Sequence, residues 1–152
     1  MQSWNESHFD ELSWHDNHVH GFWIRAGQHG AGELILDLDF IVEWLRPGDG
    51  ALRFRVAPAT LTFHDVYDLV VNLDYPSVQA GIEPFSIKDI EREPYVFPGG
   101  ASGFRWRIPV NWPAGSITFV GRRFTQVLRS EPVETETQHL PASQRVPISG
   151  AM

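Results

Sequence analysis

The chain has 152 residues, 42% of them apolar, and no cysteine, which predicts one domain with a packed core and excludes disulfides, thiolate catalysis and cysteine-ligated zinc. Its net charge of −7 disfavours nucleic-acid binding, because that function needs clustered Lys and Arg against phosphates. The polar, acidic start lacks the pattern of a signal peptide, and no apolar run is long enough to span a membrane, so we expect a cytoplasmic protein that binds neither membrane nor nucleic acid.

The first predicted elements are an irregular lead-in over residues 1–16 and a strand over residues 18–26. The next element carries the clearest pattern of the chain, since apolar residues occupy every second position from Glu33 to Trp44. Successive side chains of a strand point to opposite faces. The pattern therefore predicts a strand over residues 33–45, with one buried face and one mostly solvated face.

A turn with strong Pro and Gly signals follows at residues 46–50. Three shorter alternating stretches come after it and predict strands over residues 52–57, 59–64 and 69–75. If the strands on either side of the turn form a hairpin, the cross-strand neighbour of Glu43 is Arg53 or Arg55. Such a pair of opposite charges would stabilise this register.

The second half of the chain predicts four more strands and a tail. Phe85–Arg92 is a strand whose period also permits one helical turn, and Phe104–Trp112 is a clear strand. Pro109 cannot donate a ladder hydrogen bond, so this strand is expected at an edge or with a bulge. The last two strands cover residues 116–121 and 124–129, and the Pro-containing residues 130–152 form an extended or disordered tail.

Taken together, the strand spacing predicts the all-β class. We expect a single antiparallel β-sandwich or barrel over residues 1–129, with about seven to nine strands and no long helix.

Histidine carries the sharpest chemical signal. His18 and His20 lie on one face of the first strand, where both could bind one metal ion. Asp16 could supply a third ligand and His64 a fourth, and such a set suits a transition metal such as zinc or iron. The alternative is a surface or hydrogen-bonded structural role for these histidines.

The paired carboxylates Asp37 and Asp39 give a weaker signal. They fall on the solvated face of the strand over residues 33–45, where solvation and pairing with arginine explain them better than a glycosidase role. No motif of a catalytic nucleophile is present in the sequence.

The aromatic and arginine-rich stretch near the end predicts a contact surface. Trp and Arg dominate the energies of protein interfaces, and Trp112, Arg122 and Arg123 are the residues we expect to contact another protein. Trp106 is expected in the core. A third hypothesis places an apolar small ligand inside a barrel, among Trp23, Trp44 and Trp106.

Two stretches carry a resemblance to known proteins. They are the opening Leu12-Ser13-Trp14-His15-Asp16-Asn17-His18-Val19 and the run from Pro58 to Val66 with Leu69-Val70-Val71. Residues 12–75 resemble small uncharacterised bacterial β-rich domains, several of which are similar to immunity proteins of polymorphic toxin systems. The resemblance implies a cytoplasmic, non-enzymatic protein that binds another protein, and it transfers no catalytic residue.

Our leading hypothesis is a non-catalytic binding module that acts through protein–protein contacts, with another protein or a second copy as partner and no cofactor. The rivals are a small metal-dependent enzyme with a His-rich site and a barrel that binds an apolar ligand.

Overall fold

The computed structural model describes residues 2–27, 30–48, 50–76 and 81–148. These residues form an all-β fold with two short 3-10 helices, so the predicted class is confirmed. The ten strands of the described chain exceed the expected seven to nine. The elements are β1 (Ser3–Asn5), η1 (Glu6–Glu11), β2 (His18–Ala26), β3 (Gly32–Leu45), β4 (Arg53–Asp74), β5 (Phe85–Ile87), β6 (Glu91–Val96), β7 (Ser102–Trp112), β8 (Ala114–Gly121), β9 (Arg123–Leu128), β10 (Val133–Thr135) and η3 (Ala142–Gln144).

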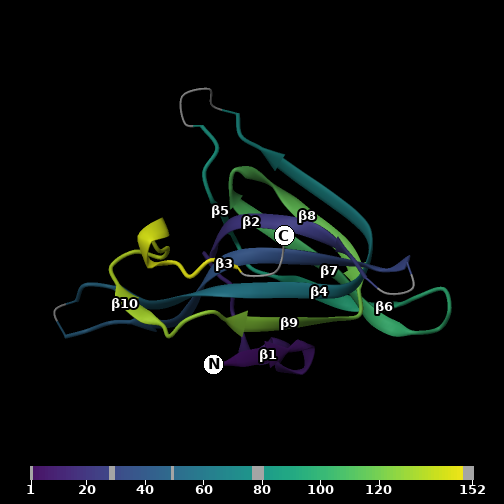
Figure 1. The fold of residues 1–152 in the computed structure, drawn as a ribbon, viewed down its shortest axis with the longest axis horizontal. Helices are drawn as coiled ribbons and strands as arrows, with labels where there is room; N and C mark the ends of the chain where they lie inside the picture. Colours follow the sequence, from purple (N-terminus) through teal and green to yellow (C-terminus); the bar gives the residue numbers. More distant parts are fainter. Residues whose placement is uncertain (1, 28–29, 49, 77–80, 149–152) are drawn as a thin grey trace.

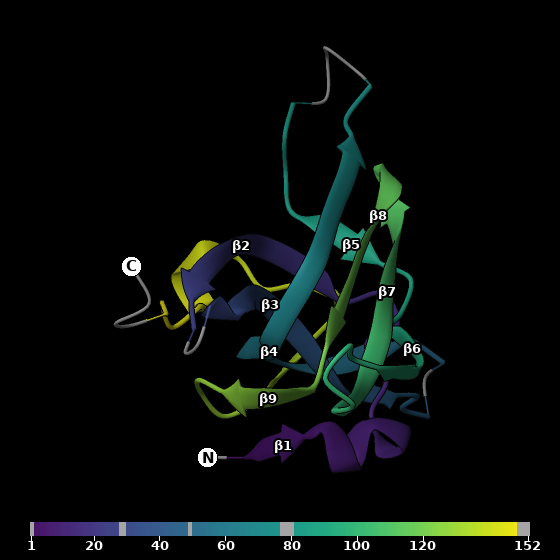
Figure 2. The same cartoon turned by 90° about the vertical axis from the view of Figure 1, so that its right-hand side faces the viewer.

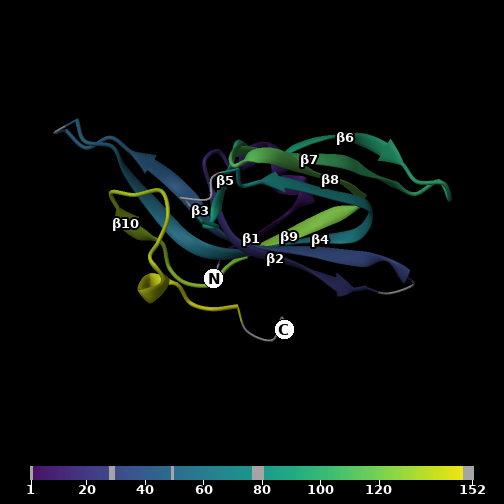
Figure 3. The same cartoon turned by 90° about the horizontal axis from the view of Figure 1, so that it is seen from above.

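All pairs of neighbouring strands are antiparallel, and part of the sheet closes into a ring. The order β1-β9-β4-β3-β2-β5-β7-β6 forms the main path, and β8 pairs with both β4 and β7. The ring is therefore β4-β3-β2-β5-β7-β8 (Figure 1). Seen from above, β6, β7 and β8 form one layer, and β2, β3, β4 and β9 form the other (Figure 3).

The long strand β4 bends where the two layers meet (Figure 2). Its first half pairs with β9 and its second half with β8. Asp65 and Asp68 have φ values of 57° and 55° at the bend, a left-handed conformation that Asp tolerates better than most residues. The prediction of three separate strands was wrong here, because residues 53–74 form one strand, with bulges at the two aspartates.

The core lies between the layers and is rich in aromatic rings. Trp106, Phe63, Phe119 and Phe124 are at most 1% exposed and pack against one another, mostly edge to face. Trp14 joins them from the chain before β2. Each large ring buries on the order of 150–250 Å², so this cluster holds the layers together. The expectation that Trp106 is a core residue is confirmed.

The hairpin of β3 and β4 has the predicted register. Glu43 is the cross-strand neighbour of Arg55, and the Arg55 Nη1 and Glu43 Oε2 atoms are 3.4 Å apart. The alternation was wrong at its end, since Trp44 is 42% exposed and packs edge to face on Phe54. This end of the hairpin projects beyond the ring (Figure 1). Other residues of the chain pack against only one side of the two strands there.

The segment after β9 lies on the outer side of the layer that contains β3 and β4 (Figure 3). Its strand β10 pairs with Phe54–Val56 of β4. Leu140 is 1% exposed and packs with Ile41, Phe54 and Val56 in a second, smaller apolar cluster. Within the described residues, no helix has the length and hydropathy that a membrane crossing requires.

Candidate functional site

The four predicted metal ligands do not meet around one point. His20 Nε2 lies 2.8 Å from Asp39 Oδ2, whereas His64 Nδ1 lies 2.6 Å from Glu33 Oε2. The two histidines therefore serve different carboxylates. Among the described residues, no group of three or more His, Asp or Glu side chains is placed to hold a metal ion.

The other two predicted ligands have separate partners as well. Asp16 accepts hydrogen bonds from Asn111 and Gln138. The His18 ring faces the ring of His139, with 4.6 Å between their centroids. Burial, and then the nearby His139, lower the pKa of His18, so His18 is held in its neutral form near pH 7.

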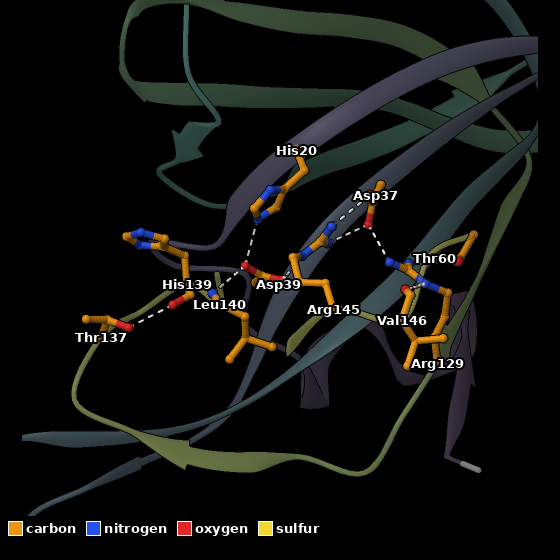
Figure 4. A network of polar contacts seen from close by, with 10 residues as sticks. All are labelled: His20, Asp37, Asp39, Thr60, Arg129, Thr137, His139, Leu140, Arg145 and Val146. Carbon is orange, nitrogen blue, oxygen red and sulfur yellow. Dashed lines mark hydrogen bonds and ion pairs between the residues drawn. The ribbon is translucent and has the colours of Figure 1, made fainter. Parts of the chain in front are cut away.

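The carboxylates Asp37 and Asp39 form the most deeply buried ionic network of the described chain (Figure 4). Arg145 Nη2 lies 2.6 Å from Asp37 Oδ1, and Arg145 Nε lies 2.8 Å from Asp39 Oδ1. Arg129 Nη2 donates to Asp37 at 2.7 Å. Asp39 also accepts the backbone N–H of Leu140.

These contacts correct the expectation that both carboxylates lie on a solvated face. Asp39 is fully buried, because the C-terminal segment covers that side of β3. The expected pairing with arginine is present. Burial alone would raise the pKa of each carboxyl, but the donors outweigh it and lower both pKa values. Both aspartates are thus ionised and fully occupied, which suits an anchor for the C-terminal segment.

A separate groove of about 710 Å³ lies at the bend of β4. One wall is the loop between β6 and β7, and the other is formed by the bend with the junction of β8 and β9. Three aromatic rings stand in it: the Tyr67 and Phe97 centroids are 5.9 Å apart, and Tyr95 and Phe97 are 5.1 Å apart. Tyr67 is 46% exposed. The groove therefore offers a partly open aromatic cluster.

The groove also contains charges that have no partner in the described residues. The side chains of Arg122 and Arg123 are exposed and form no hydrogen bond or ion pair with the described residues, unlike those of Arg105 and Arg107 on β7. Asp65 and Asp68 also line this groove. Two of the three predicted contact residues, Arg122 and Arg123, thus lie beside a partly exposed aromatic cluster.

The remaining predicted tryptophans lie elsewhere. Trp112 is 40% exposed and packs on Tyr75, at the end of β7 farthest from the groove. Trp23 is half-buried on β2, whereas Trp44 is exposed and Trp106 is buried in the core. Trp23, Trp44 and Trp106 do not line a common cleft among the described residues. The hypothesis of an apolar ligand held among them therefore has no support from their positions.

A second cleft of about 490 Å³ adjoins the groove and shares Asp65 and Arg123 with it. It is lined by Glu33 and His64. His64 Nε2 lies 3.1 Å from the Thr125 hydroxyl oxygen. Sequence reasoning missed Glu33 and Thr125, because they are 31 and 61 residues from His64. Only the strand register, which pairs β4 with both β3 and β9, could have indicated them.

Comparisons with known proteins do not narrow the function. The chain matches no protein-family model, and the search of curated proteins finds no similar sequence.

Proposed function

We propose that this protein is a binding module that acts through protein–protein contacts at the groove beside the bend of β4. The observation that supports this most is the position of Arg122 and Arg123, whose side chains have no ion-pair partner within the described chain and lie next to the exposed ring of Tyr67. Arg and Tyr are enriched among the residues that dominate binding energies. The groove supplies both in one place.

The charges favour one kind of partner segment. Asp65 and Asp68 have a local reason to be present, since the left-handed backbone of the bend favours Asp. Arg122 and Arg123 have no such reason. A partner segment that presents carboxylates to these two arginines, and an apolar or aromatic side chain to Tyr67, fits the groove best.

Residues 12–75 resemble small bacterial β-rich domains, several of which are similar to immunity proteins of polymorphic toxin systems, and this adds toxin proteins to the partners that should be tested. A second copy of this chain is the other class of partner.

The test places a photo-cross-linking amino acid at position 67 and, as a control, at position 44. Both positions hold exposed aromatic residues, at 46% and 42% exposure, and Trp44 pairs with Phe54 near the turn of the β3–β4 hairpin, away from the bend of β4. We expect a cross-link to one partner, or to a second copy, from position 67 only. Equal cross-linking from both positions would refute the groove as the binding surface.

The affinity of the identified partner is then measured with charge-reversed variants. Arg122→Glu with Arg123→Glu should weaken binding about 30-fold, the effect of losing one interface hot spot. Arg46→Glu is the matched control, because Arg46 is also exposed and has no partner in the described chain. Binding that is unchanged in the double variant would contradict the proposal.

A further inference from the structure

A continuous chain of hydrogen bonds runs from a carboxylate and an imidazole that line the cleft next to the groove to an exposed hydroxyl beside that cleft. Glu33 Oε2 to His64 Nδ1 is 2.6 Å, and His64 Nε2 to Thr125 Oγ1 is 3.1 Å. A nucleophile within hydrogen-bond reach of a base, with that base oriented by a third group, is the signature of an activated hydroxyl. Both distances fall within the range that this signature requires.

The proton positions in this chain follow from the chemistry of its members. An ionised carboxylate can only accept, so His64 donates from Nδ1 to Glu33. When the ring is neutral, its lone pair is on Nε2 and the Thr125 hydroxyl donates to it. This is the tautomer in which an imidazole can take the hydroxyl proton.

Glu33 is held in its ionised form. Burial raises its pKa, but hydrogen bonds from Arg25 and His64 outweigh that effect and lower the pKa. Arg25 Nε donates to Glu33 Oε1 at 2.8 Å, which leaves Oε2 for His64. Glu33 can therefore stabilise the imidazolium that forms when His64 accepts a proton.

The backbone at this position is not regular. Leu34 pairs with Phe63 and Gly32 with Val66, so β4 has one residue more than β3 between these pairs. The extra residue forms a bulge at His64 and Asp65, where Asp65 has a φ of 57°. Bulges often re-aim a side chain beside an active site, and strained backbone gathers at such sites.

An electrophilic group lies on the same face of the sheet. Arg123 is the cross-strand partner of His64 on β9 and precedes Thr125 by two residues, so all three side chains share the outer face. Arg123 lines the cleft, and its side chain has no hydrogen-bond or ion-pair partner within the described chain. Its guanidinium is placed to stabilise negative charge on an oxygen bound next to Thr125.

From this geometry we infer that Thr125 is an activated nucleophile, and that it hydrolyses small carboxylic esters bound at the edge of the cleft. The Thr125 oxygen bonds to the ester carbonyl carbon while His64 Nε2 takes the hydroxyl proton. The C–O bond to the alcohol then breaks, and His64 returns the proton to the departing alkoxide. Water attacks the acyl-Thr125 in the same way and releases the acid. This activity goes beyond the proposed binding role and does not depend on it.

The test is covalent labelling of the full chain with a fluorophosphonate, in which the Thr125 oxygen displaces fluoride from phosphorus. We expect one adduct, which peptide mass spectrometry maps to Thr125. His64→Gln should slow labelling at least about 100-fold, the usual contribution of a general base. Hydrolysis of p-nitrophenyl acetate should fall in parallel.

Two further variants complete the experiment. Thr125→Val should abolish labelling, while Thr118→Val is the matched control, since Thr118 lies on β8 without a histidine partner in the described chain. The thermal unfolding midpoint of each variant shows whether it is folded. An unlabelled wild-type chain, an adduct on another residue, or equal labelling of a folded His64→Gln variant would each overturn the inference.

Discussion

The ionic network beneath the C-terminal segment gives the clearest prediction about stability. Arg145 is 10% exposed and bonds Asp37 and Asp39, which are 17% and 0% exposed. Removing one partner of a buried ion pair costs about 3–5 kcal/mol, because a charge stays buried without compensation. Since Arg129 still pairs with Asp37, we expect Arg145→Ala to lower the free energy of unfolding by about 3 kcal/mol, the low end of that range.

A partly exposed arginine that also contacts the C-terminal segment provides the control. Arg53 pairs with Glu134 and Glu136, which are 55% and 81% exposed. Exposed pairs contribute about 0–1 kcal/mol, so Arg53→Ala should leave the free energy of unfolding within about 1 kcal/mol of wild type. Urea unfolding at pH 7, with the slope m fitted for each variant, measures both losses.

A double-mutant cycle separates the ion pair from other effects of the substitution. Asp37→Ala and Arg145→Ala together should show a coupling energy of about 1–3 kcal/mol. If Arg145→Ala and Arg53→Ala are equally mild, or if the coupling energy is zero, the network does not anchor the segment as reasoned here.

Three other substitutions test separate parts of the fold. Burial and His139 lower the pKa of His18 in the folded chain. The contribution of His18 to stability is therefore complete above its unfolded pKa of about 6.5 and is lost as the pH falls below that value. His18→Gln should flatten the fall of the urea midpoint from pH 7 to pH 5, and an unchanged slope would contradict this. Gly115 has a φ of 150°, and a Cβ there would collide with the Asn72 carbonyl oxygen, so Gly115→Ala should cost about 2 kcal/mol or more while Gly99→Ala, with open space around it, changes the thermal midpoint little. Phe63 is 1% exposed, and Phe63→Ala should lower the free energy of unfolding by about 3–5 kcal/mol, a loss that calorimetry would detect.

The strands that could be predicted are those whose pattern is decided locally. The strand His18–Ala26 has the predicted bounds, and the Glu43–Arg55 pair has the predicted register. In both cases the information lies within one strand or one hairpin. Alternation indicates which side of a strand is buried, and a tight turn determines which residues of the hairpin face each other.

The features that could not be predicted depend on segments far apart in the chain. Asp39 has the alternation of an exposed residue, yet Leu140 and Arg145, more than 100 residues later, cover it. The sequence predicted a break between the strands over residues 59–64 and 69–75, where Asp65 and Asp68 lie. Pairing with β8 and β9 instead keeps both residues inside one strand. A local pattern cannot show which segment supplies the cover or the pairing.

The bend of β4 explains why the two proposed sites lie side by side. A closed ring of six strands requires its longest strand to pass from one layer to the other, and the extra residue at His64 and Asp65 provides that turn. The same bulge aims His64 at Glu33 and Thr125, and it opens the groove in which Tyr67 stands. The bulge therefore serves both the fold and the proposed sites. It is recognised from the strand register and not from a linear sequence motif.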